Sequence, residues 1–303
     1  MKPVRPLAAA LAEGAVVLDG GLSNQLEAQG CDLSDALWSA RLLADAPQQI
    51  AAAHAAYVRA GAQVLITASY QATFEGFAQR GVAPREASEL LAHSVELARA
   101  AAEFTDREVW VAASVGPYGA MLADGSEYRG RYGLSVRELE RFHRPRIEAL
   151  VAAEPDVLAL ETVPDSDEAE ALLRVVAGCG VPVWLSYSID GDRTRAGQRL
   201  DAAFALAAGN EQVIAVGVNC CEPQYADRAV ECAASVTGKP VVVYPNSGEK
   251  WDAEGRVWRG GRTYDPARVR EWRAAGARLV GGCCRIGPEQ IEELAGLLRP
   301  QAR

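Results

Sequence analysis

The feature that most constrains this sequence is the repeated pairing of a short apolar segment with a longer, alanine-rich segment of helical periodicity. The apolar segments are rich in β-branched residues and end in small, polar or charged residues. Continuous apolar runs of this length suit strands that are buried on both faces, as they are in a parallel sheet. We count eight such strands, at residues 16–21, 64–69, 109–116, 157–162, 183–188, 214–220, 241–246 and 279–284.

Eight units in 303 residues average about 38 residues each, which is the size of one strand-helix unit of a TIM barrel. The sequence therefore predicts an α/β fold with a single (β/α)8 TIM-type barrel as one domain over residues 1–303. A doubly wound open sheet is the alternative. The dinucleotide fingerprint G-x-G-x-x-G that often accompanies such a sheet is missing after the first strand.

Helix boundaries are predicted by the residues between the strands. Asp45 is expected to cap the helix that begins at Pro47. Ser135 and Glu138 have the spacing of a capping box ahead of the next amphipathic stretch. Gly61 follows a helical segment and is expected to end it.

The charge balance narrows the class of partner. The chain has 31 Lys+Arg against 40 Asp+Glu, a formal net charge of −9, so a nucleic-acid partner is not expected. No apolar run is long enough to span a bilayer. The N-terminal segment resembles a signal peptide, but Glu13 and Asp19 interrupt it. We therefore expect a cytoplasmic protein without a membrane partner, and the oligomeric state stays open.

Cysteines at two strand ends are the strongest chemical signal. Cys220 ends the sixth strand in the segment GVNCC, and Cys283 and Cys284 end the eighth in GGCCR. Thiolates are preferred ligands of Zn²⁺. Adjacent residues of a strand point to opposite faces, so the pair can share one metal only if the chain turns there, which Gly281 and Gly282 permit. Three thiolates with an open fourth position describe a catalytic zinc site.

Two other interpretations of these cysteines remain open. They could be ordinary buried cysteines, or Cys221 could complete a closed, structural four-sulfur site. A histidine zinc site is disfavoured because His54, His93 and His143 form no ligand pattern and are expected on helix surfaces. No lysine lies at a strand end, so imine chemistry is also disfavoured.

Carboxylates and aromatic residues complete the predicted mouth of the barrel. Asp19 and Glu161 follow the first and fourth strands and could hold a substrate ammonium group, although Asp19 could instead cap the turn after it. Long loops at 117–134 and 247–264 are typical of substrate-covering segments. Aromatic rings near these strand ends could attract a cation, namely Tyr70, Tyr118, Tyr128, Trp251 and Trp258.

These residues lie in segments that resemble the homocysteine S-methyltransferase family, and most closely its branch that uses S-methylmethionine. The segments are DGGLSNQLEAQG, ITASYQATFEGF, SVGPYGAMLADGSEYRG, ALETVPD, GVNC, YPNSGE and GGCCR. The resemblance implies a (β/α)8 barrel that binds Zn²⁺ through Cys220, Cys283 and Cys284. It also implies that Asp19 and Glu161 hold homocysteine. Further substrate-binding candidates are Asn246, Ser247 and Tyr70.

The reaction implied by the resemblance is methyl transfer from a sulfonium donor to the thiolate of homocysteine, which forms methionine. The expected donor is S-methylmethionine, with S-adenosylmethionine as the alternative. Betaine, folate and cobalamin are not expected, because the sequence lacks the segments that accompany them in related branches. A rival from another class is a non-catalytic zinc or dithiol protein built on the same barrel.

Overall fold

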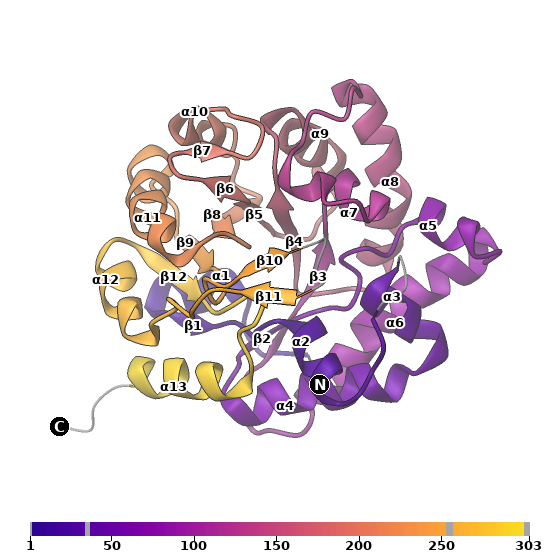
Figure 1. Cartoon of the computed structure of the whole chain (residues 1–303), viewed down its shortest axis with the longest axis horizontal. Coiled ribbons are helices and arrows are strands. Elements are labelled where there is room, and N and C mark those ends of the chain that lie inside the picture. The colour runs from indigo at the N-terminus through magenta and orange to yellow at the C-terminus, as the bar shows by residue number, and fades with distance from the viewer. Residues whose placement is uncertain (1, 34–36, 253–256, 300–303) are drawn as a thin grey trace.

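The computed structural model describes residues 2–33, 37–252 and 257–299. Eight parallel strands lie at the centre of the molecule, ordered β1-β12-β9-β8-β5-β4-β3-β2 (Figure 1). The two strands at the ends of this order, β1 and β2, are joined by a parallel bridge between Leu18 and Val64, which closes the barrel. This arrangement confirms the predicted fold class. The strands are β1 (Val16–Val17), β2 (Val64–Ile66), β3 (Trp110–Val115), β4 (Val157–Val163), β5 (Val183–Tyr187), β8 (Val213–Asn219), β9 (Val241–Tyr244) and β12 (Ala277–Val280).

Helices surround the barrel and alternate with its strands (Figure 1). Those that follow the first three strands are α2 (Leu22–Ala28), α3 (Trp38–Asp45), α4 (Pro47–Ala60), α5 (Phe74–Gln79), α6 (Pro84–Ala102), α7 (Tyr118–Leu122), η1 (Ser126–Tyr128) and α8 (Val136–Ala152). The later ones are α9 (Ser166–Val176), α10 (Leu200–Ala205), α11 (Pro223–Thr237), η2 (Pro266–Arg268), α12 (Val269–Ala274) and α13 (Pro288–Leu298).

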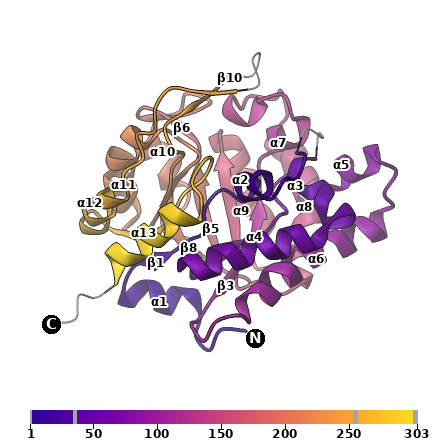
Figure 2. The same ribbon diagram turned by 60° about the horizontal axis from the view of Figure 1, so that its bottom comes forward.

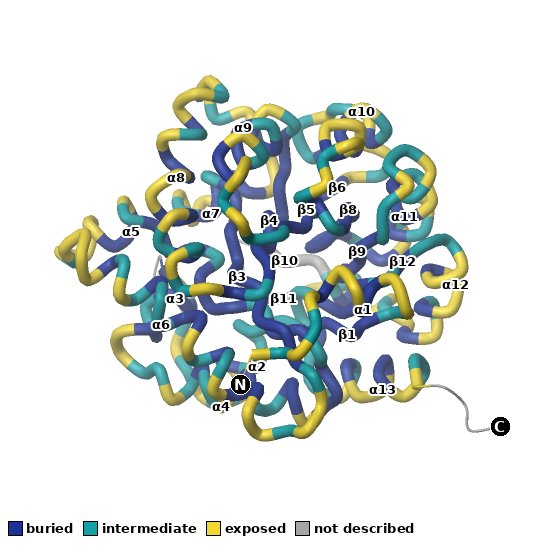
Figure 3. Tube along the Cα trace, turned by 180° about the vertical axis from the view of Figure 1, so that it is seen from behind, coloured by how far each residue is buried: buried dark blue, intermediate teal, exposed yellow. Residues whose placement is uncertain are grey.

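Two apolar layers make up the core, and Figure 3 shows that the central strands are buried. The larger layer lies between the strands and the helices, and the smaller one fills the barrel. Helix α1 (Leu7–Glu13) lies at one end of the barrel, near β1 (Figure 2). Its residues Leu7 and Leu11, each 1% exposed, belong to the smaller layer. The indole Nε1 of Trp110 donates to the carbonyl of Arg5 at 2.9 Å. The segment before β1 therefore closes the N-terminal end of the barrel.

Loops at the other end carry short elements of their own. The hairpin of β6 (Ile189–Asp190) and β7 (Arg193–Thr194) follows β5, and the hairpin of β10 (Lys250–Asp252) and β11 (Val257–Arg259) follows β9. Most strands end earlier than predicted, as β1 does at Val17 and β12 at Val280, whereas β4 ends one residue later, at Val163. The residues beyond these ends turn into the loops where the predicted site residues lie. Among the described helices, none is long and apolar enough to cross a membrane.

The helix-end predictions are partly confirmed. Ser135 and Glu138 form the capping box of α8, and Gly61 ends α4 in the left-handed region at φ 106°. The prediction for Asp45 is wrong. Asp45 is the last residue of α3, and Ala46 precedes Pro47 without any side-chain cap, because the two helices are separated by only one residue.

The prediction that the histidines lie on helix surfaces is wrong for two of the three. His54 and His143 are fully buried, whereas His93 is partly exposed. Burial lowers the pKa of His54 to about 4 and that of His143 well below its ordinary value. His143 lies 2.9 Å from the carboxylate of Glu168, a contact between α8 and α9 that helical periodicity alone does not indicate.

Candidate active site

Three cysteines meet at the C-terminal mouth of the barrel. Cys220 follows β8, and Cys283 and Cys284 follow β12, with β9 between these strands. Their sulfur atoms all lie within 4.8 Å of one another, and Cys220 Sγ is 3.7 Å from Cys284 Sγ. Cys220 is buried and the other two are half-buried. The cluster is therefore compact enough for one metal ion to contact all three sulfurs.

Backbone geometry turns these cysteines toward one another. Cys220 has a φ of 48°, in the left-handed region that few residues other than glycine adopt. A Cβ atom on Gly281 would lie 2.7 Å from the carbonyl oxygen of Asp19, and one on Gly282 would collide with the side chain of Ile286. The two glycines thus allow the chain after β12 to approach its neighbours closely. The residue of this segment in the left-handed region is Arg285, with φ 67°.

The ionisation of the three thiols is linked. Hydrogen bonds from Cys283 and Cys284 lower the pKa of Cys220 well below its ordinary value. The same hydrogen bonds to Cys220 raise the pKa of Cys283 and Cys284, because each is favoured as the neutral donor. Cys220 is therefore the thiol of the three that ionises most readily. A soft divalent cation is the kind of partner that would let all three ionise, so the donor set fits zinc.

Cys221 lies apart from this cluster. It is fully buried in the apolar layer between strands and helices, and burial raises its pKa to about 12. The sulfur group found among the described residues contains Cys220, Cys283 and Cys284 without it. The closed four-sulfur arrangement considered from the sequence is therefore not formed.

Asn246 and Ser247 support the backbone beside the cluster. Asn246 Oδ1 accepts a hydrogen bond from the amide of Cys284 at 3.1 Å, and the amide of Ser247 donates to the carbonyl of Cys284 at 3.0 Å. The hydroxyl of Ser247 donates to Glu249 at 2.9 Å. These contacts hold the segment that carries Cys284. The predicted contact of both residues with substrate stays a prediction.

The two predicted acids are buried at the same mouth. Asp19 is 1% exposed, and its Oδ2 accepts from the amide of Ile66 at 2.8 Å, whereas its Oδ1 is buried without a hydrogen-bond partner. Glu161 accepts from Ser114 Oγ, and from Tyr244 Oη at 3.0 Å. Burial raises the pKa of Glu161 to about 7 and that of Asp19 well above its ordinary value. Asp19 thus bonds the neighbouring strand and does not cap the turn that follows it.

An asparagine that the sequence analysis did not single out fixes the end of β4. Thr162 has a φ of 58°, which is unusual for a β-branched residue. Its amide donates to Asn219 Oδ1 at 2.7 Å, and Asn219 Nδ2 donates to the Thr162 hydroxyl at 2.7 Å. Since Thr162 directly follows Glu161, these bonds orient the acid. The sequence signal that could have identified Asn219 is the asparagine of the segment GVNC, directly before Cys220.

Two of the predicted aromatic residues lie near the cluster. Tyr128 Oη is 3.1 Å from Cys220 Sγ, and the guanidinium of Arg195 lies 5.5 Å from the centre of the Tyr128 ring. A Cβ atom on Gly116 would come within 2.7 Å of the ring of Tyr70, so the chain just after β3 packs directly against that ring. The predicted aromatic surface is therefore formed in part, by residues from loops after β2 and β3.

The remaining aromatic candidates do not join this surface in the described structure. Tyr118 packs against Phe142, with ring centres 4.8 Å apart, and against Tyr132 at 5.2 Å. The side chains of Trp251 and Trp258 lie outside the described residues.

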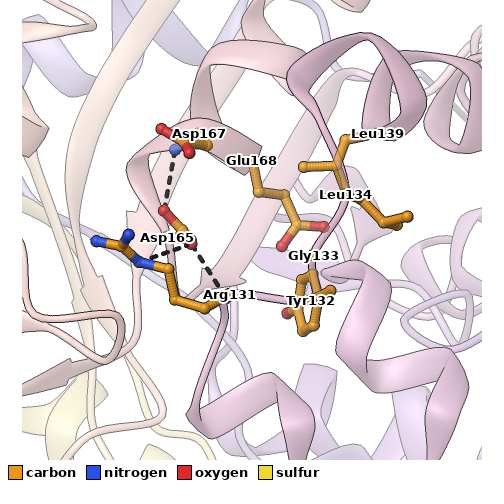
Figure 4. A pocket seen from close by; sticks show the side chains of 8 residues that line it. All are labelled: Arg131, Tyr132, Gly133, Leu134, Leu139, Asp165, Asp167 and Glu168. Carbon is orange, nitrogen blue, oxygen red and sulfur yellow. Dashed lines mark hydrogen bonds and ion pairs between the residues drawn. The ribbon is translucent and has the colours of Figure 1, made fainter.

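A separate cavity of about 260 Å³ lies beside the loop after β4 and includes none of the predicted site residues (Figure 4). Asp165 on its wall accepts hydrogen bonds from the amide of Arg131 at 3.1 Å and from Gln198 at 2.6 Å. These bonds tie the loop after β3 to the loop after β5. The cavity wall consists of Arg131, Tyr132, Gly133, Leu134, Leu139, Asp165, Asp167 and Glu168.

The fold and the site together define a (β/α)8 barrel with a three-thiol cluster and two buried acids at its C-terminal mouth, where TIM-barrel enzymes carry out their chemistry. Residues 16–298 match the family described as homocysteine S-methyltransferase. The chain belongs to this family, which confirms the resemblance seen in the sequence and identifies the protein as an enzyme.

Individual relatives agree over nearly their whole length. The chain is 45% identical to the homocysteine S-methyltransferase of Escherichia coli, with 97% of this chain and 99% of that protein covered. It is 44% identical to homocysteine S-methyltransferase YbgG of Bacillus subtilis, with 94% of each covered. A crystal structure of the E. coli homocysteine methyltransferase MmuM in its metallated form superposes with a TM-score of 0.87, at 44% identity and 96% and 99% coverage.

Proposed function

We propose that this protein transfers a methyl group from a sulfonium donor to the thiol of L-homocysteine, and that Zn²⁺ held by Cys220, Cys283 and Cys284 supports the reaction. The observation that carries the proposal is the group of three sulfurs within 4.8 Å beside two buried acids. The names of the relatives in E. coli and B. subtilis support homocysteine as the acceptor.

The choice of zinc rests on the donor set. Thiolates favour soft or borderline metals, and three protein ligands leave one position for substrate. The metallated form of the E. coli relative supports a metal at this site. When bound, zinc would supply a Lewis acid that makes the homocysteine thiol, with an ordinary pKa of about 8.5, a thiolate at neutral pH.

Asp19 and Glu161 are proposed to hold the ammonium group of homocysteine. The buried Oδ1 of Asp19 lacks a hydrogen-bond partner within the protein, and a buried carboxylate oxygen is costly unless a donor pairs with it. An ammonium group would provide that donor. It would also lower the raised pKa of both acids, because a nearby positive charge favours the carboxylate.

The transfer itself needs positioning more than acid-base catalysis. The homocysteine sulfur forms a bond to the donor methyl carbon while the carbon–sulfonium bond breaks, and its electron pair stays on the donor sulfur. The thiol proton of homocysteine is released to solvent. Because the sulfonium is already activated by its charge, the protein mainly has to align the two sulfurs and exclude competing nucleophiles.

The test is the yield of methionine per homocysteine consumed by reduced, zinc-loaded protein. With S-methylmethionine we expect two methionines, one from the methylated acceptor and one from the demethylated donor. With S-adenosylmethionine we expect one methionine and one S-adenosylhomocysteine. A protein that holds zinc but forms no methionine from either donor would contradict the proposal and favour the non-catalytic dithiol alternative.

Three further expectations accompany the proposal and stay predictions: residues 1–303 form one domain, the protein is cytoplasmic, and it acts on small molecules without a nucleic-acid partner.

A further inference from the structure

A third buried acid lies at the mouth of the barrel and has no role in the chemistry described above. Glu127 belongs to η1, in the loop after β3, and is only 6% exposed. Its Oε2 is buried and has no hydrogen-bond partner within the protein. A buried carboxylate oxygen without a partner is costly, and such groups in native proteins call for an explanation. A cationic ligand would provide one.

The backbone around Glu127 is firmly held. The amide of Tyr128 donates to the carbonyl of Gly125 at 3.0 Å, and the amide of Ser126 donates to Asp124 at 2.9 Å. A Cβ atom on Gly119 would lie 2.5 Å from the amide nitrogen of Glu127. Helix α7 therefore packs closely against this turn and sets the position of the acid before any ligand binds.

The carboxylate of Glu127 lies toward the thiol cluster. The next residue, Tyr128, places its hydroxyl 3.1 Å from Cys220 Sγ. The charge of Glu127 raises the pKa of Tyr70, so the acid lies within electrostatic reach of that ring. The groups that shift the pKa of Glu127 itself include Cys220 and Asp124 but no cationic side chain. The protein thus buries an acid next to the tyrosine that contacts the cluster, and among the described residues Glu127 forms no ion pair with a cationic side chain.

We propose that Glu127, together with the rings of Tyr70 and Tyr128, binds the positively charged sulfonium of the methyl donor. The inference rests on the proposed function, since the donor must approach the acceptor sulfur at the cluster. A carboxylate and aromatic faces are both suited to a cation that carries no hydrogen-bond donor on its sulfur.

The chemistry of the transfer predicts which kinetic constant Glu127 controls. The sulfonium loses its positive charge as the methyl group leaves, so its attraction to a carboxylate is strongest in the ground state and weaker in the transition state. An interaction of this kind lowers the KM of the donor without raising kcat. It also favours release of the neutral thioether, because that product no longer pairs with the acid.

The test compares Glu127→Gln with a matched control, Glu168→Gln. Glu168 is also buried, its Oε2 also lacks a partner and its pKa is also raised to about 7, but it lies between α8 and α9, where it contacts His143. We would measure binding of S-methylmethionine to the zinc-loaded protein by calorimetry without homocysteine, so that no turnover occurs. Zinc content and homocysteine binding would be measured on the same samples.

We expect Glu127→Gln to weaken donor binding about tenfold to a hundredfold, the usual range for losing a hydrogen-bonded or paired charge. Its donor KM should rise by a similar factor while kcat, zinc content and homocysteine binding stay close to wild type. Glu127→Asp, which keeps the charge, should recover part of the loss. The control Glu168→Gln should leave donor binding unchanged.

A second donor separates the sulfonium from the ammonium group of S-methylmethionine. Dimethylsulfoniopropionate has a sulfonium but no ammonium group, and Glu127→Gln should weaken its binding by the same factor. The inference would be overturned if Glu127→Gln weakened the binding of S-methylmethionine alone. It would also be overturned if Glu127→Gln bound both donors as tightly as an active wild-type protein does. If wild-type protein forms no methionine and binds neither sulfonium, the proposed function itself fails, which is a distinguishable result.

Discussion

The two ends of the barrel differ in how completely their polar groups are paired. At the N-terminal end, α1 packs apolar side chains into the barrel, and the one polar atom of the Trp110 side chain is hydrogen-bonded to Arg5. At the mouth, Asp19 and Glu127 each keep a buried oxygen without a partner. Thr162, Cys220 and Arg285, which lie there, adopt the left-handed region.

This difference suggests that the closed end of the barrel mainly stabilises the fold and that the mouth mainly serves binding and catalysis. Unpaired buried oxygens and left-handed backbone both cost free energy. Those of Asp19 and Glu127 lie where substrate would complete the pairing, whereas that of Glu168 lies between α8 and α9. The closed end contributes apolar burial around α1, and its left-handed residue Glu154, before β4, pairs with Lys2 at the surface. Changes at the two ends should therefore have separable effects, on stability at one end and on binding or turnover at the other.

The largest effect is expected from the thiol cluster. Cys284→Ser should remove most of the bound zinc and lower turnover by more than about 100-fold, because even residues that only support metal ligands typically cost 10–100-fold. Zinc content by elemental analysis and methionine formation measure the two effects.

The matched control is Cys221→Ser. This neighbour of Cys220 is buried in the outer apolar layer, so the variant should keep its zinc and lose some stability. Equal loss of zinc in Cys221→Ser and Cys284→Ser would contradict the assignment of Cys284, and not Cys221, as a zinc ligand.

At the closed end, Leu11→Ala should lower the free energy of unfolding by about 2–5 kcal/mol, because it leaves a cavity under α1. Zinc content and the KM of homocysteine should remain at wild-type values. Denaturant unfolding with parallel kinetics tests this. A raised KM with unchanged stability would contradict the separation of the two ends.

The pH dependence of stability should change in Glu168→Gln. Burial raises the pKa of Glu168 from 4.5 to about 7, so the folded state favours the protonated acid. Its contribution is fully present below pH 4.5 and is lost as pH rises through 7. Relative to the variant, wild-type protein should lose about 3 kcal/mol of stability across this window. The free energy of unfolding of both proteins would be measured from about pH 4 to pH 8. If it changed with pH equally in wild type and Glu168→Gln, Glu168 would not titrate as inferred.

A smaller effect is expected for Asp19→Asn, which should raise the KM of homocysteine by about 10–100-fold through loss of a charged partner for its ammonium group. Asp156→Asn is the matched control. Oδ2 of Asp156 also accepts from a strand amide, that of Val111 at 2.7 Å, but this acid lies before β4 and pairs with Arg99. The control should change stability and not KM. Similar KM values for Asp19→Asn and wild type would remove Asp19 from the acceptor site.

Much of this arrangement could be predicted from the sequence because its signals are local. Apolar runs mark the strands, and in a barrel the residues just beyond them meet at one mouth. That is why Cys220, Cys283, Cys284, Asp19 and Glu161 could be brought together before any coordinates. The same reasoning selected Ser135 and Glu138 correctly as a capping box.

What could not be predicted depends on contacts between distant segments. Glu127 lies in an irregular loop, and Gly119 of α7 packs closely against its backbone. The left-handed conformation of Thr162 depends on Asn219, which lies on β8. The burial of His143 depends on its contact with Glu168. None of these leaves a periodic or compositional signal in the sequence.

The central claim is that three thiols hold one zinc ion and leave a position for the acceptor sulfur. X-ray absorption at the zinc edge tests it directly on reduced, zinc-loaded protein. We expect three sulfurs and one lighter atom in the absence of substrate, and four sulfurs after homocysteine is added. Four sulfurs from the start, with no change on adding homocysteine, would contradict the account.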